Sequence, residues 1–191
     1  MARIPASPYR LNVRDLSGRP GEYRDETVTL AVPEALGEGL VAVREGARLS
    51  FDVRLESVHE GILATTGVDT VAEGECGRCL IDIALPVEVE FTELFGYHAG
   101  EAIEYEVQDD HVDLEPLIRD AVVLALPFQP VCRPDCPGLD PETGLRLADH
   151  PELAATETSR DPRWAALTGF RASADDGAGD EPDADQQREK R

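Results

Sequence analysis

Four cysteines are the residues of this sequence whose spacing indicates chemistry. Two residues separate the members of the first pair, three separate those of the second, and a long insert lies between the pairs. Structural zinc takes four ligands in a tetrahedron, and two close pairs of thiolates can supply them. The predicted zinc ligands are Cys76, Cys79, Cys132 and Cys136. Four thiolates would leave no open position for water, so we expect a structural rather than a catalytic ion.

The same cysteines allow other interpretations. Cys76 and Cys79 could form a redox pair, although a position between strands lacks the helix N-terminus that lowers a thiol pKa. All four could be free thiols in small buried sites, or they could form a disulfide only on isolation. At the level of sequence these alternatives stay open.

The other polar residues form no recognisable catalytic set. The four histidines are scattered, and we find no Gly-rich phosphate loop, no Ser–His–Asp set and no paired carboxylates. An acidic run between residues 101 and 110 is typical of a solvated loop, and it could also meet a basic partner. We therefore expect no catalytic residues, no small-molecule substrate and no enzymatic activity.

Strands must position the first cysteine pair. Large apolar residues at 49, 51, 53 and 55 alternate with polar ones, which is the period-two pattern of a half-buried strand over 49–58. Further strands are predicted at 27–32, 40–44, 62–75 and 80–91. Such alternation favours a mainly antiparallel sheet with one wet face. The sheet is compatible with a barrel, and the first cysteine pair falls between two of its strands.

A helix must position the second pair. Residues 113–126 repeat apolar side chains at helical spacing, with Asp113 as the predicted N-cap and Pro127 as the stop. We expect the apolar stripe to pack on the sheet. A zinc ion bound by both pairs would tie a turn of the sheet to the segment that follows this helix.

The predicted fold class is α+β, with one packed helix on a mostly antiparallel sheet and a disordered acidic C-terminal tail. The 191 residues suffice for one domain and its tails. Residues 1–26 are expected to be irregular, 27–136 to form the β-rich core, and 137–170 to hold loops and a short amphipathic segment. Residues 171–191 lack large apolar side chains and are expected to be disordered.

Charge restricts the partners. The chain has 18 Lys and Arg against 39 Asp and Glu, a net charge of −21. Nucleic-acid binding usually requires a basic patch, so a partner that is itself basic is the simpler inference. Neither a signal peptide nor a stretch of about 18 uncharged apolar residues is found, so we expect a cytoplasmic protein outside the membrane. In that compartment cysteines are reduced or metal-bound.

Four segments, taken in order, resemble the YceD family of bacterial and plastid proteins. They are residues 74–80 with the first cysteine pair, 112–127 with the helix, 130–139 with the second pair, and 161–167 with an Asp-Pro-Arg-Trp motif. The similarity spans roughly residues 8–170. Many relatives carry two more cysteines where this chain has Asp140 and Thr143, which raises the question of whether Asp140 is an oxygen ligand.

The resemblance implies a role in the accumulation of large-subunit ribosomal RNA, hence in ribosome assembly, without enzymatic activity. Together with the charge, it predicts an accessory factor that binds a basic ribosomal protein or pre-ribosomal RNA, with the cysteine site as a structural brace. Two rival hypotheses are a thiol-based redox-sensing or metal-binding protein and an RNA-processing enzyme. The sequence specifies neither the client nor the oligomeric state.

Overall fold

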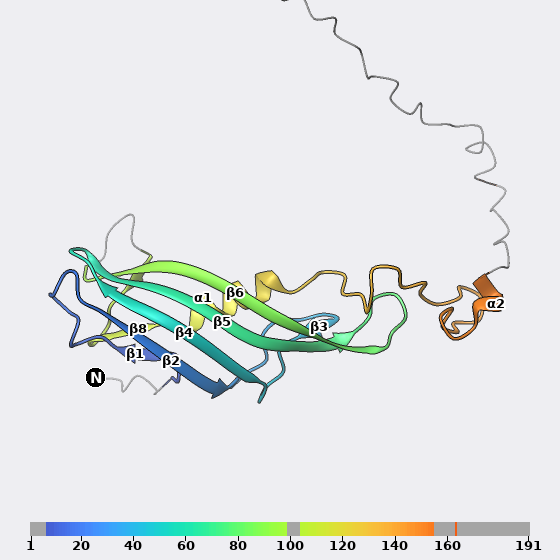
Figure 1. The fold of residues 1–191 in the computed structure, drawn as a ribbon, viewed down its shortest axis with the longest axis horizontal. Coiled ribbons are helices and arrows are strands. Elements are labelled where there is room, and N and C mark those ends of the chain that lie inside the picture. Colours follow the sequence, from blue (N-terminus) through green and yellow to red (C-terminus); the bar gives the residue numbers. More distant parts are fainter. Residues whose placement is uncertain (1–6, 99–103, 155–162, 164–191) are drawn as a thin grey trace, which may run out of the picture. The chain divides into compact units, whose positions relative to one another are not determined.

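The computed structural model describes residues 7–98, 104–154 and 163 (Figure 1). The chain divides into two units, Met1–Pro151 and Glu152–Arg191, and the features discussed below belong to the first, apart from Arg163 and a short helix at residues 151–154. The predicted acidic tail lies outside the described residues, as does the amphipathic segment except for Arg163. The elements are β1 (Arg10–Asn12), β2 (Tyr23–Ala31), β3 (Val41–Ala42), β4 (Arg48–Ser57), β5 (Gly61–Glu75), β6 (Asp82–Gly96), β7 (Tyr105–Glu106), β8 (His111–Asp113), α1 (Glu115–Ala125) and α2 (Pro151–Ala154).

A six-stranded, mainly antiparallel sheet dominates the fold, as predicted. Its order is β2-β4-β5-β6-β7, with β3 paired to β5 and β7 parallel to β6. The longest pairing runs from Gly61 opposite Gly96 to Glu75 opposite Asp82. The alternating sequence pattern was also compatible with a barrel, but in the part of the chain that the structure describes the sheet does not close into one. Among the described residues the sheet is open, because its edge strands β2 and β7 do not pair with each other, and β1 and β8 form a separate two-stranded sheet.

The core lies on the inner face of the large sheet. The alternating apolar residues of β4 are all buried, as their period-two pattern predicts. The β4 residues share one hydrophobic core with Ile118 and Val122, the buried residues of α1. The N-terminal segment contributes Tyr9, whose ring stacks on that of Phe51 with 6.4 Å between centroids. Helix and N-terminal segment therefore share one core with the sheet.

The helix α1 begins two residues later than predicted. Leu114 occupies the N-cap position, while the Asp113 carboxylate accepts a hydrogen bond from the Glu115 N–H at 3.0 Å. The helix ends at Ala125, because Pro127 disfavours a helical conformation at the residue before it. No helix within the described ranges has the length and apolar character needed to cross a bilayer.

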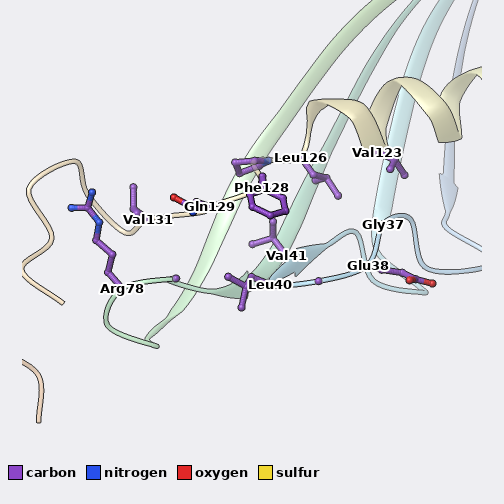
Figure 2. A pocket seen from close by; sticks show the side chains of 13 residues that line it. Gly37, Glu38, Leu40, Val41, Arg78, Val123, Leu126, Phe128, Gln129 and Val131 are labelled. Atoms are coloured by element: carbon purple, nitrogen blue, oxygen red, sulfur yellow. The ribbon is translucent and has the colours of Figure 1, made fainter. Parts of the chain in front are cut away.

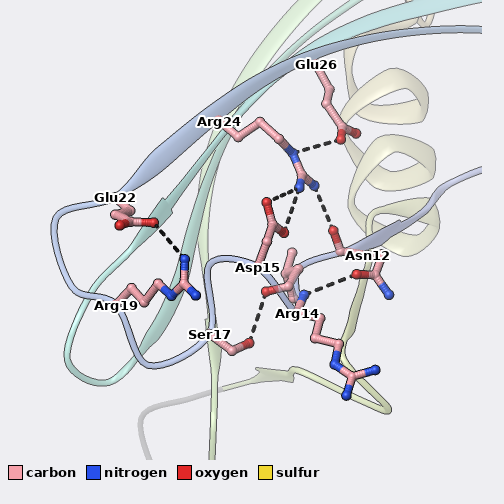
Figure 3. A network of polar contacts seen from close by, with 9 residues as sticks. Asn12, Arg14, Asp15, Ser17, Arg19, Glu22, Arg24 and Glu26 are labelled. Atoms are coloured by element: carbon pink, nitrogen blue, oxygen red, sulfur yellow. Dashed lines mark hydrogen bonds and ion pairs between the residues drawn. The ribbon is translucent and has the colours of Figure 1, made fainter.

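The N-terminal region, expected to be irregular, contains β1 and the first residues of β2. Arg24, near the start of β2, holds this N-terminal region in place (Figure 3). Its guanidinium donates to both carboxylate oxygens of Asp15 at 2.7 Å and to the Asn12 carbonyl at 2.7 Å. It also pairs with Glu26 at 2.9 Å. These contacts anchor the loop after β1 on the edge of the sheet.

Candidate metal centre

The first cysteine pair lies in the turn between β5 and β6, as predicted. The turn is closed by a bond from the Cys76 N–H to the Ile81 carbonyl at 2.8 Å, and the Leu80 N–H donates to the Cys76 carbonyl at 2.9 Å. Leu80 adopts a φ of 57°, in the left-handed region that few side chains favour. Strand pairing on both sides thus fixes a tight turn that presents Cys76 and Cys79.

The second pair follows α1 and is brought to this turn by backbone hydrogen bonds. The Gly77 N–H donates to the Pro130 carbonyl at 2.7 Å. The Cys132 N–H points to the Cys76 sulfur at 3.4 Å. A bond from the Cys136 N–H to the Arg133 carbonyl at 3.1 Å closes the second turn. Segments more than fifty residues apart in the sequence therefore meet at one point.

The four sulfur atoms have the arrangement that a tetrahedral ion requires. All of them lie within 4.8 Å of one another. Cys76 and Cys136 are 3.9 Å apart at their sulfurs, and Cys79 and Cys132 are 3.7 Å apart. Zinc–sulfur bonds of about 2.3 Å give tetrahedron edges of about 3.8 Å. All four cysteines are free rather than disulfide-bonded. The structure thus brings together every predicted ligand, and we name this set the cysteine cluster.

The thiols have unequal proton affinities. Burial acts to raise the pKa of Cys76, but backbone N–H donors, from Arg78 and Cys132 among others, outweigh it and lower this pKa to about 6. Burial and then the neighbouring sulfurs raise the pKa of Cys132 to about 12. Cys76 therefore forms a thiolate readily, while Cys132 keeps its proton unless a cation stabilises the charge. A divalent ion at the centre would supply that stabilisation.

Arg78 joins the two turns, a role that sequence reasoning missed. One nitrogen of its guanidinium donates to the Pro134 carbonyl at 3.2 Å and to the Cys136 carbonyl at 3.1 Å. Gly138, at a φ of 81°, lies so close that a Cβ there would come within 3.3 Å of the Arg78 carbonyl oxygen. A basic residue inside the first pair was the only sequence signal for this contact.

Asp140 does not join the cysteine cluster. Its carboxylate accepts hydrogen bonds from the Thr143 N–H at 2.7 Å and from the Thr143 hydroxyl at 2.6 Å. These two bonds lower the pKa of Asp140. The two residues found in place of the additional cysteines of many relatives therefore close a turn of their own.

The outer face of the sheet, opposite the core, is strongly acidic. Asp69 on β5 lies directly opposite Glu88 on β6, and Glu75 lies opposite Asp82. All four of these side chains are exposed. Like charges at directly opposite positions destabilise a sheet. This acidic arrangement therefore opposes folding instead of supporting it.

The part of the chain that holds the cysteine cluster matches a known protein family. Residues 65–171 match the family described as large ribosomal RNA subunit accumulation protein YceD. The chain belongs to the YceD family. Its matched residues contain both cysteine pairs, the β5–β6 turn and α1. The family description supports a role related to ribosome assembly.

Mycobacterial proteins are similar to the chain over most of its length. An uncharacterized protein of Mycobacterium tuberculosis is 44% identical over 172 residues, which cover 86% of this chain and 82% of that protein. One of Mycobacterium leprae is 36% identical over 173 residues, covering 87% and 79%. The uncharacterized protein YlbN of Bacillus subtilis is 31% identical over 100 residues, covering 48% and 56%. No solved structure matches the chain.

Proposed function

We propose that this YceD-family protein is a non-enzymatic, cytoplasmic accessory factor in ribosome assembly. It supports the accumulation of large-subunit ribosomal RNA by binding a basic ribosomal protein, alone or with pre-ribosomal RNA. The family description supports the assembly role. The observation that carries the mode of action is the acidic outer face of the sheet.

The charge pattern favours a protein client. Asp69 and Glu88 repel each other across two paired strands, and a cationic side chain placed over them would relieve that repulsion. RNA phosphates would instead add negative charge to the same face. The chain as a whole carries −21, which would steer a basic protein toward it in a salt-sensitive encounter.

We also propose that the cysteine cluster binds one structural zinc ion. The donor set supports this, since four sulfurs within 4.8 Å of one another match the size of a thiolate tetrahedron. When bound, zinc would hold the β5–β6 turn against the segment after α1. With all four positions filled by protein, the ion would have no site for a reacting water.

The function is tested in a strain that lacks the gene. We expect its large-subunit RNA to fall relative to small-subunit RNA and the large-subunit peak of a sucrose gradient to shrink. Wild-type protein should restore both, and a variant with Asp69→Lys and Glu88→Lys should not. The matched control carries Glu45→Lys and Glu60→Lys, the same charge change at two exposed turn residues outside the sheet, and should restore both. Unchanged RNA levels on deletion would refute the proposal.

A thiol-based redox sensor is the second candidate, favoured by the lowered pKa of Cys76. It requires a reversible disulfide between Cys76 and Cys79 and no bound metal. Mass spectrometry after mild oxidation distinguishes the two. The full burial of Cys76 restricts the access of an oxidant and favours the structural role.

A further inference from the structure

A groove of about 750 Å³ lies next to the cysteine cluster and is not used by anything described so far. One wall comes from residues 37–41 around β3, and the other from residues 123–131 at the end of α1. Figure 2 shows Leu40, Val41, Leu126 and Phe128 around this space. The groove is therefore lined mostly by apolar side chains.

The walls are held by contacts inside the protein. β3 is fixed to β5 where Val41 pairs with Gly74. Gly37, at a φ of 88°, lets Leu126 pack directly on its backbone, at the place where a Cβ would collide with the leucine side chain. The bond from the Gly77 N–H to the Pro130 carbonyl ties the far wall to the first cysteine turn. The groove thus exists before any partner arrives.

The groove exposes large apolar side chains to solvent. Phe128 is 93% exposed and Leu40 is 44% exposed, and Val123 adds a further apolar surface beside them. Exposed apolar patches next to a formed cavity mark interaction sites. An aromatic residue at the centre of such a patch is a common binding hot spot.

Charge decides which partner fits. Arg78 also lines the groove and keeps its positive charge, but its guanidinium is bonded to the carbonyls of Pro134 and Cys136. The Glu38 carboxylate makes no ion pair among the described residues and is therefore free to bind a cationic group. A second copy of this chain would bring another −21 and a second Glu38. RNA would bring phosphates to the same carboxylate. A basic protein segment meets Glu38 with an opposite charge.

We infer that this groove binds a short segment of a basic protein, in which a leucine or phenylalanine is flanked by lysines or arginines. The apolar side chain packs against Leu40 and Phe128, and a cationic neighbour meets Glu38. This inference rests on the proposed function, because it takes the basic ribosomal client proposed above as the occupant and gives its apolar part a binding site in addition to the acidic outer face.

The probe is the set of RNA-free proteins extracted from purified large ribosomal subunits of the same organism. They are passed over immobilised full-length protein that is wild type, Phe128→Ser or Leu145→Ser. Leu145 is 45% exposed in a loop and does not line the groove, so it is the matched control. Retained proteins are identified by mass, and the bound segment is mapped with synthetic peptides.

We expect wild type and Leu145→Ser to retain the same basic protein, and Phe128→Ser to retain it about tenfold less well, as for a central interface residue. Within the mapped peptide, serine in place of its leucine or phenylalanine, or glutamine in place of its lysines or arginines, should abolish binding. Circular dichroism confirms that each variant is folded.

Four results would overturn the inference. Equal retention by wild type and Phe128→Ser would place the client elsewhere while leaving the proposed function intact. Self-association that Phe128→Ser abolishes would make a second copy the occupant, and precursor RNA bound through Phe128 would make RNA the occupant. If wild type retains no large-subunit protein at low salt, both the proposal of a protein client and the proposal that it binds in the groove are refuted. The role in ribosome assembly is tested separately by the deletion strain.

Discussion

Asp69 and Glu88 lie directly opposite each other on β5 and β6, and both are exposed on the outer face of the sheet. Cross-strand pairs of this kind stabilise a sheet when their charges are opposite and destabilise it when they are alike. A sheet selected for stability alone would avoid this pair. Its presence is understandable when the face serves to attract cations.

Replacing Glu88 with lysine should therefore change stability and binding in opposite directions. Against Asp69, the lysine turns repulsion into attraction and should raise the free energy of unfolding by about 0.2–1 kcal/mol. It should also weaken the binding of a basic client. Urea unfolding and client retention measure the two effects, with Glu60→Lys as the charge-matched control. A loss of stability in Glu88→Lys would contradict this account of the pair.

The cysteine cluster should contain about one zinc ion per chain when the protein is purified without chelators. Cys136→Ser should lose the metal, because it removes one of four ligands. Asp140→Ala should keep it, because the Asp140 carboxylate is bonded to Thr143. Elemental analysis with a count of free thiols gives the answer. Four free thiols without metal would leave the cysteines as packing residues.

Substitution of Arg78 should weaken metal retention without removing a ligand. One nitrogen of its guanidinium bonds two carbonyls of the second cysteine turn, and a methionine side chain of similar length has no donor to replace it. Loss of such an outer contact lowers metal affinity by about 10–100-fold. We expect Arg78→Met to release zinc to a competing chelator at correspondingly lower chelator concentrations. Arg133→Met, which removes an exposed ion pair with Asp135, should behave as wild type.

Two glycines of β5 should respond to alanine in opposite ways. At Gly74 a Cβ would collide with the Leu40 carbonyl, so Gly74→Ala should separate β3 from β5 at a cost of about 1–3 kcal/mol. At Gly67 nothing lies within 4 Å of a Cβ. Gly67→Ala should therefore stabilise the fold by about 0.4–1 kcal/mol, because alanine lowers the conformational entropy of the unfolded chain. Thermal unfolding of both variants checks this, and equal effects would contradict it.

The Arg24 contacts should contribute a pH-dependent part of the stability. The hydrogen bond from Arg24 lowers the pKa of Asp15 below its ordinary value of 3.8. A carboxylate with a lowered pKa stabilises the folded state above that ordinary value, and the contribution is lost as the pH falls through the folded pKa. Asp15→Asn should thus be less stable than wild type at neutral pH, and the gap should narrow below pH 3.8. A gap independent of pH would show that Asp15 acts through packing.

Much of the sheet could be predicted because alternation is a local signal. The pattern at 49–58 corresponds to β4, which lies one residue earlier, and that at 62–75 corresponds to β5, which begins one residue earlier and ends as predicted. The strand predicted at 27–32 begins earlier, at Tyr23. Its first residues are charged, and β2 tolerates them because it is an edge strand with one side open to solvent.

Features that depend on distant contacts could not be predicted. β1 and β8 have three residues each, which is too short for a recognisable alternation of apolar and polar side chains. Their pairing also joins segments about a hundred residues apart in the sequence. The four cysteines were found by spacing, but the Arg78 bonds to the second turn depend on the folded geometry. The groove was missed for the same reason, since its walls at 37–41 and 123–131 meet only in three dimensions.

Cys76 and Cys136 are 60 positions apart, which has a consequence for the order of synthesis. When the first cysteine pair leaves the ribosome, the second does not yet exist, and β6, β8 and α1 must be made before it appears. The cluster is thus a late, long-range contact, and slow to form compared with the hairpins. Because Pro130 and Cys132 fix the wall that carries Phe128, the groove becomes complete only in a chain whose translation has passed residue 132. A nascent, half-made copy would not yet compete for the client.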